Sequence, residues 1–227
     1  METTAANINL MNQIIYPGMV MLIILTNGCG GNQEYAPNIT LPKTGQTIDA
    51  IAEFHNLYPV HSLITGKQTF GLEALTAKRV EPTELVRQVE NEFLAKLDEA
   101  GVFSRVTRFD PHPDVILSGR ITALHEHYRP QRWAGMKDLV PYGGKIAQLL
   151  RLKTHVSSGE VHLTLFVLKS SGEILGTYTG RSSFNETFTP INNKPPPGIF
   201  LNRALSEAVH QIQNGLSHDR VLRKVAS

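Results

Sequence analysis

The chain has very little cysteine, no marked excess of either charge and no apolar run long enough to span a bilayer. Its 227 residues include one Cys, which excludes an internal disulfide and any metal site built from several cysteines. The formal net charge of +2 is near balance, so composition does not indicate a nucleic-acid partner. Hydrophobic residues at 41% and charged residues at 19% are typical of one globular domain.

The most apolar segment lies near the start of the chain, from Ile14 to Leu25. A helix needs roughly 20 apolar residues to span a bilayer, and this segment is shorter and contains Pro17 and Gly18. A short apolar core followed by small residues is typical of a secretory signal that is cut off. We therefore expect residues 1–28 to be a signal peptide, with the start codon open between Met1 and Met11.

The single cysteine follows this segment in the sequence "LTNGC", which resembles the lipobox of bacterial lipoproteins. The resemblance implies that Cys29 carries a diacylglycerol thioether and begins the mature chain. It also implies that Gly30 favours sorting to the outer membrane, facing the periplasm. Acyl chains contribute about 0.8 kcal/mol per buried methylene, so the lipid would anchor the protein without spanning the membrane. A buried free Cys in a core helix is the alternative, but "GCGGNQEYAPN" cannot continue a helix.

Residues 29–47 are polar and rich in turn residues, so we expect the lipidated Cys and a flexible tether there. A single folded domain is expected over 48–216 and a basic, frayed tail over 217–227. Residues 48–65 are ambiguous, because "IDAIAEF" fits one or two helical turns and "HNLYPVHSLIT" fits the start of the domain. Partial alternation over 67–79 predicts the first strand.

The clearest helix follows Pro82, in "TELVRQVENEFLAKLDEAG". Its apolar residues recur at steps of three and four on one face, and Gly101 is well placed to end it. That face comprises Leu85, Val86, Val89, Phe93, Leu94 and Leu97.

Strands are expected over 102–109 and 114–128, and a hairpin is expected in "SGEVHLTLFVLKSSGEILGTYTGRSSF", with Gly172 in its turn. In the second of these strands, alternation predicts that Ala123 shares the core side and that Leu124 points the other way. An amphipathic helix over 199–216 completes the chain. Its predicted buried stripe comprises Ala204, Leu205, Ala208, Val209 and Ile212.

The expected order is therefore β-α-β-β-β-β-α. Two helices with one apolar face each can both cover one side of a sheet. The fold class predicted is α+β: a two-layer sandwich of a mainly antiparallel four- to five-stranded sheet with two helices on one face.

The strand phrases "PDVILSGRI" and "VHLTLFVLKSSGEILGTYTG" resemble those of small bacterial envelope lipoproteins. The similar families are the YajG-type lipoproteins, the penicillin-binding-protein activator, the curli-secretion lipoprotein and the N-terminal domain of the Tol-system β-propeller protein. The resemblance covers roughly residues 66–216. It implies a binding or assembly module, and it carries over no catalytic residue.

Histidines were considered as metal ligands. His125 and His127 would point the same way on a strand, but a zinc site needs further ligands, so exposed polar residues are the preferred interpretation. His162 is expected on the strand face opposite Val161 and Leu163. The "YGGK" at 142–145 lacks phosphate-loop spacing, and Ser157 and Ser158 lack a hydrolase motif. We expect no metal, no cofactor and no nucleic-acid partner.

A basic insert over 129–154 interrupts the strands and holds the only Trp. It is suited to contact with an anionic membrane surface, a glycan or an envelope protein, and the alternative is a flap that packs on its own sheet. The residues predicted to make the contact are Arg129, Arg132, Trp133, Lys137 and Lys145.

The sequence thus predicts a lipid-anchored, non-enzymatic envelope lipoprotein that acts as a binding or assembly accessory in the periplasm. The alternative is a subunit of an outer-membrane secretion or transport assembly. The size of the soluble domain in solution would separate a monomeric accessory from a ring-forming subunit.

Overall fold

The computed structural model describes residues 35–59, 82–131, 150, 152–189 and 198–225. The α+β class and the predicted order of elements are confirmed, with one short helix added at the end. The elements are β1 (Ile48–Pro59), α4 (Pro82–Glu99), β2 (Phe103–Thr107), β3 (Val115–Pro130), β4 (His155–Lys169), β5 (Ile174–Phe188), α6 (Ile199–His218) and α7 (Arg220–Val225).

One sheet holds all five strands in the order β2-β1-β3-β4-β5. The long pairings of β3 with β4 and of β4 with β5 are antiparallel, as predicted. β1, however, runs parallel to both β2 and β3, so the sheet is mixed. The parallel β1–β2 pair follows from the intervening α4, because a crossover through a helix returns the chain in the same direction.

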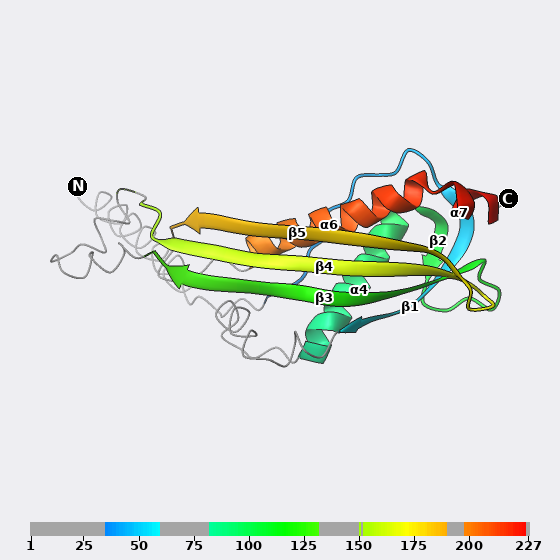
Figure 1. Ribbon diagram of the computed structural model, residues 1–227, viewed down its shortest axis with the longest axis horizontal. Helices are drawn as coiled ribbons and strands as arrows, with labels where there is room; N and C mark the ends of the chain where they lie inside the picture. Colours follow the sequence, from blue (N-terminus) through cyan, green and yellow to red (C-terminus); the bar gives the residue numbers. More distant parts are fainter. Residues whose placement is uncertain (1–34, 60–81, 132–149, 151, 190–197, 226–227) are drawn as a thin grey trace, which may run out of the picture. The chain divides into compact units, whose positions relative to one another are not determined.

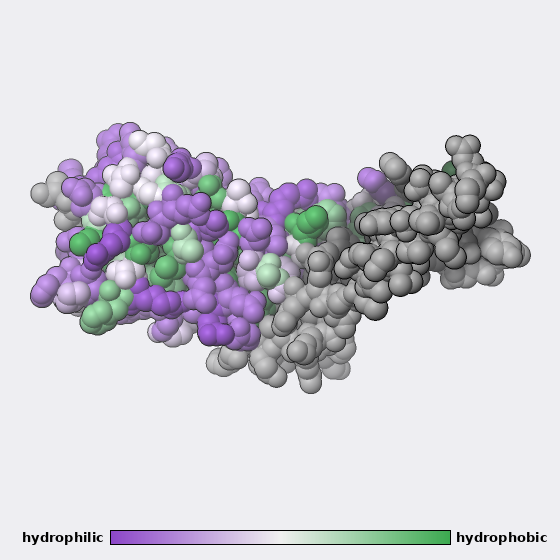
Figure 2. All heavy atoms as spheres, turned by 180° about the vertical axis from the view of Figure 1, so that it is seen from behind, coloured by the Kyte–Doolittle hydropathy of each residue, from purple (hydrophilic) through white to green (hydrophobic). Residues whose placement is uncertain are grey.

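Helices α4 and α6 lie behind the sheet in Figure 1 and cover one of its faces. Alternate residues of each strand point toward them and are buried, such as Phe54 in β1 and Leu165 in β4. The whole predicted stripe of α6 is buried as well. Each large apolar side chain that is fully removed from water stabilises the fold by roughly 1.5–3 kcal/mol. Seen from the helix side, the surface is mostly hydrophilic with scattered apolar residues (Figure 2).

A bulge in β3 makes one prediction wrong. Ile121 pairs with Leu163, but Ala123 then pairs with His162 and Leu124 with Val161, so Thr122 is an extra residue. Because paired residues point to the same side, the bulge reverses the alternation. Leu124 therefore packs against the core, and Ala123 lies on the opposite face.

The ambiguous segment at 48–65 is resolved for its first part. Residues 48–59 form β1, with Ile48, Ala50, Ala52 and Phe54 buried. The alternation in "IDAIAEF" therefore has the period of a strand and not that of a helix. The strand predicted at 67–79 lies outside the described residues.

The tether prediction is wrong for residues 35–47, which we call the strap. Tyr35 is 1% and Ile39 0% exposed, and the strap runs alongside α6, in blue in Figure 1. Asn202 accepts hydrogen bonds from the Tyr35 hydroxyl at 2.8 Å and from the backbone N–H of Asn38 at 3.1 Å. Asn202 Nδ2 in turn donates to the carbonyl oxygen of Ala36. Turn-rich composition indicated a loop, but these side chains fix the loop to a helix.

The tail prediction is wrong in the same way. Residues 220–225 form α7, and Leu222 is 1% exposed. Arg223 donates hydrogen bonds to the side chain of Gln46 and to the carbonyl oxygen of Ser217. Up to Val225 the tail is thus joined to the end of the strap and not frayed.

The exposed edges of the sheet are partly closed by helix side chains. Gln211 of α6 accepts from the N–H of Arg181 and donates to its carbonyl oxygen, both at 2.9 Å, on β5. Glu90 of α4 accepts the N–H of Leu57 on β1, beyond Glu53, the last residue of β1 that pairs with β2. Unpaired backbone groups at an edge invite another strand, so these contacts disfavour edge-to-edge pairing at those positions.

Candidate functional site

The face of the sheet opposite α4 and α6 is covered by no helix in the described part of the chain, and it faces the viewer in Figure 1. Its residues alternate along each strand with the buried ones. His162, for example, lies between Val161 and Leu163, which are 0% and 1% exposed. This is the side predicted for His162. We call this surface the open face.

Basic and imidazole side chains follow one another along the open face, from the middle of β3 toward its end and across to β4 and β5. Arg120 precedes the bulge in β3, His125 and His127 follow it, and His162 and Arg181 lie on β4 and β5. His162 pairs with Arg181 across β4 and β5, and with Ala123 across β3 and β4. We call these five residues, Arg120, His125, His127, His162 and Arg181, the open-face strip.

The open-face strip contains a cation–π contact and an ion pair. The Arg120 guanidinium lies over the ring of Phe166, 5.8 Å from the ring centroid. This contact keeps the arginine side chain close to the surface of the sheet. Arg181 contacts Glu160 at 2.8 Å, with the arginine side chain 67% exposed. An exposed pair of this kind contributes little to stability, so its guanidinium remains accessible to an acidic partner.

Glu126 carries a buried carboxyl group on the face of β3 opposite the open-face strip. Glu126 is 1% exposed, and its Oε1 accepts a hydrogen bond from the hydroxyl of Ser157. Its Oε2 is buried and has no partner among the described residues. Burial raises the pKa of Glu126, and the Ser157 hydrogen bond opposes part of that shift. The carboxyl is therefore held partly toward its neutral form.

Tyr35 of the strap lies near this carboxyl. Burial raises the pKa of Tyr35, and the charge of Glu126 raises it further. The ring packs on Gly198 at the start of α6, where a Cβ would come within 2.1 Å of it and where φ is +61°. Only glycine fits that close approach and that backbone conformation. The hydroxyl of Ser157 is thus bonded to the Glu126 carboxyl, and Tyr35 lies near that carboxyl.

A shallow polar cavity of about 290 Å³ lies between the strap and the end of α6. It is lined by strap residues 42–46 and by Gln213, Asn214, Ser217 and His218. Gln213 donates its Nε2 to the carbonyl oxygen of Pro42 at 2.7 Å, and its Oε1 has no partner within the described ranges. A water molecule or small polar group suits this site.

Of the predicted contact residues, Arg129 is described. It lies exposed near the end of β3, two residues beyond His127 and on the same face. Arg132, Trp133, Lys137, Lys145 and Cys29, the predicted lipidation site, lie outside the described residues, as does the "YGGK" at 142–145.

Sequence reasoning missed the strip as a group. His125 and His127 were placed correctly on one face, but their alignment with Arg181 depends on strand register and on the bulge. Among the described residues, no cluster of three or more His, Cys, Asp or Glu side chains is arranged to hold a metal ion. The described helices include none with the length and apolarity needed to cross a bilayer.

Comparison with known proteins finds structural likeness but no sequence relative. No family model matches the chain, and no curated protein matches it. The fold is similar to the crystal structure of protein XCC0632 from Xanthomonas campestris, which is assigned to family-model DUF330. That likeness has a TM-score of 0.48 and 11% sequence identity, over 81% of this chain and 91% of the other.

Proposed function

We propose that this protein is a lipid-anchored, non-enzymatic accessory module of the bacterial envelope. Cys29 carries the lipid at the outer membrane, and the α+β domain works in the periplasm. The open face binds an acidic surface of another envelope protein. The chain acts by holding its partner near the membrane.

The observation that supports this function is the open face, which no described helix covers and which presents exposed arginines. A two-layer fold needs one covered face for its core, and α4 and α6 supply that cover. Within the described ranges no helix covers the other face, and Arg120 and Arg181 lie there in exposed positions. Complementary charge gives an interface its specificity and speeds the encounter, so an acidic partner is the suitable occupant.

Site-specific photo-crosslinking in cells tests this binding. A photoreactive residue at Thr179, which is exposed on the open face beside Arg181, should give one discrete protein adduct. The same residue at Asn214, exposed on α6, is the matched control and should give none. Arg120→Glu together with Arg181→Glu should remove the Thr179 adduct, whereas Arg220→Glu on α7 should not. Equal adducts from both positions, or none from Thr179, would contradict the proposal.

Fractionation of cells tests the anchor. Mass spectrometry of the native protein should find Cys29 at the N-terminus with acyl chains attached. Cys29→Ala should release the protein into the soluble fraction of the envelope. A Cys29→Ala protein that stays with the membrane, or a native chain with a free thiol, would contradict the lipid anchor.

A further inference from the structure

We propose that one end of the domain is a membrane-contact surface that binds anionic phospholipid. We call this end the tip and define it as residues 127–131, 150, 152–157 and 187–189. The inference rests on the proposed lipid anchor at Cys29, and it names a second, direct partner for the chain: the lipid bilayer itself.

The side chains of the tip combine exposed apolar groups with basic ones. Leu150 is 61% and Leu152 39% exposed, and the basic residues Arg129 and Lys153 are exposed beside them in sequence or on the paired strand end. No acidic residue occurs among these tip residues. Exposed leucines with lysine and arginine are the combination that inserts into a lipid interface while pairing with anionic headgroups.

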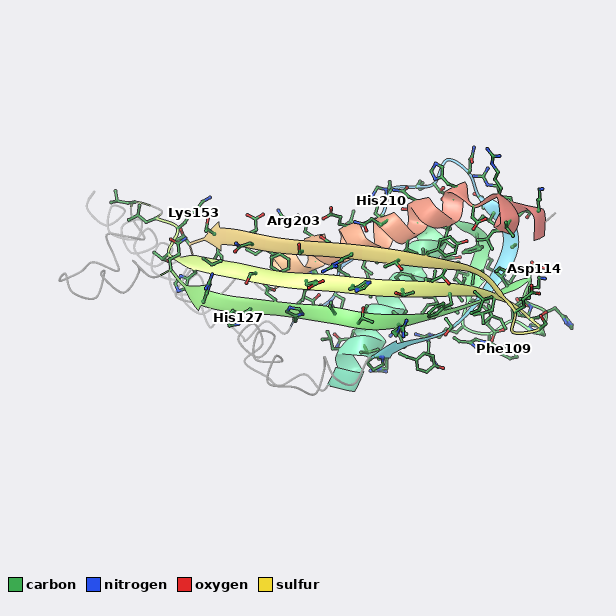
Figure 3. All side chains as sticks on the ribbon, in the orientation of Figure 1. Phe109, Asp114, His127, Lys153, Arg203 and His210 are labelled. Atoms are coloured by element: carbon green, nitrogen blue, oxygen red, sulfur yellow. The ribbon has the colours of Figure 1, made fainter. Side chains whose placement is uncertain are left out.

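The strand ends are joined firmly at this place. The N–H of Gln131 donates to the carbonyl oxygen of Thr154, and the N–H of Thr154 donates to the carbonyl oxygen of Phe188. The hydroxyl of Thr189 donates to the carbonyl oxygen of Leu152 at 2.7 Å. The exposed leucine and lysine are therefore presented on an ordered frame. Figure 3 shows Lys153 and His127 at this end and Phe109 and Asp114 at the opposite end.

Only a short length of chain separates Cys29 from the first described residue of the domain. The strap begins at Tyr35, six residue steps after Cys29. Six steps of about 3.8 Å reach at most about 23 Å. Tyr35 packs on Gly198 and lies near Glu126, so it is anchored at the level of that residue on β3. A lipid on Cys29 therefore keeps this part of the domain within about 23 Å of the bilayer surface.

The strap also determines which end of the domain is held there. From Tyr35 it runs along α6 toward Gln46, because Thr40 bonds to Ser206 and Thr44 to Ser217. Tyr35 is thus the strap residue nearest the tip. Pro130 lies four residue steps beyond Glu126 on β3, which is about 13 Å of strand. The chain between Cys29 and Tyr35 is longer than these 13 Å of strand, so the tip can touch the lipid. The β4–β5 turn lies in the other direction, about 35 Å along β4 from the level of Glu126.

Fluorescence with one labelled thiol tests the contact. Acylation consumes the thiol of Cys29, so Leu152→Cys introduces the only free thiol in the full acylated chain. A polarity-sensitive dye at that position should shift to shorter wavelength in vesicles of phosphatidylethanolamine and phosphatidylglycerol, and a quencher carried by the lipid should reduce its emission. The matched control is Ser171→Cys, exposed in the β4–β5 turn, which should show neither effect. Equal behaviour of both probes in chains shown by mass spectrometry to be acylated would overturn the inference.

A second experiment separates the tip from the anchor. The full chain with Cys29→Ala is titrated with vesicles that contain or lack phosphatidylglycerol. Each basic residue near an anionic surface is worth about a fivefold change in partition. Arg129→Glu with Lys153→Glu should therefore lower partition into phosphatidylglycerol vesicles by at least about 25-fold. The paired control, Arg87→Glu with Arg220→Glu, should leave it within about twofold.

Failure of the proposed lipid anchor and failure of the proposed membrane contact at the tip give different results in these experiments. A free thiol at Cys29 with charge-dependent partition of the Cys29→Ala chain would refute the anchor and support the tip. Acylated Cys29 with partition that is indifferent to phosphatidylglycerol and to the Arg129 and Lys153 changes would refute the tip and support the anchor.

Discussion

Release of the strap by Asn202→Ala should destabilise the protein measurably. The change removes the acceptor of Tyr35 and Asn38 and the donor to Ala36. A hydrogen bond contributes about 0.5–1.5 kcal/mol net, and a buried hydroxyl left without a partner costs about 1–3 kcal/mol. The expected loss is about 2–4 kcal/mol in the free energy of unfolding. A domain with a total of about 5–15 kcal/mol would still fold.

Urea unfolding followed by circular dichroism measures this loss. The full chain with Cys29→Ala, which takes no lipid, serves as the parent. With a slope of about 2 kcal/mol per molar urea, the midpoint should fall by about 1–2 M. Asn214→Ala is the matched control, because Asn214 is exposed on the same helix and the gain in helix propensity is the same. Its midpoint should change by less than about 0.3 M.

Hydrogen exchange shows whether the strap loosens locally or as a unit. The amide of Asn38 bonds to Asn202, whereas the amide of Thr40 bonds to Ser206 at 2.9 Å. If Asn202 fixes the whole strap, both amides should exchange faster in Asn202→Ala. Equal urea midpoints for Asn202→Ala and Asn214→Ala would refute the reasoning, because the strap would then contribute nothing to stability through this side chain.

Three further predictions follow from single positions. Burial raises the pKa of Glu126, so the folded state keeps the carboxyl proton at pH values where the unfolded state has lost it. The free energy of unfolding therefore falls as pH rises from the unfolded-state pKa toward the folded-state pKa. Glu126→Gln should make urea midpoints fall less steeply between pH 4 and 8, and an unchanged slope would contradict this prediction. Gly180→Ala should cost at least about 2 kcal/mol in thermal unfolding, because its Cβ would lie 1.8 Å from the carbonyl oxygen of Ala208; a melting temperature like that of the parent would contradict the close packing. Gln211→Ala frees both backbone groups of Arg181 on the β5 edge, so light scattering should detect self-association at lower concentration than for the parent, and identical scattering would argue against edge protection.

Several features could be predicted from the sequence because they depend on neighbours close in the chain. The apolar stripes of α4 and α6 follow from a repeat of three and four residues, and the β4–β5 turn follows from Gly172, which has a φ of +88°. The order of elements and the side of His162 depend on the same local periodicity. The open-face strip could not be predicted from local periodicity alone, because His125 and Arg181 share a face only through the register of three strands.

The sequence by itself determined the class of fold, the main helices and the candidate anchor at Cys29, since each depends on a short pattern of residue types. Only the tertiary structure decided that residues 35–47 are a strap, that Thr122 reverses the faces of β3, and that Glu126 is buried. Tyr35 and Asn202 are 167 residues apart in the chain. A contact at that separation leaves no periodic signal in either segment, because it depends on which surfaces meet after the helices have covered the sheet.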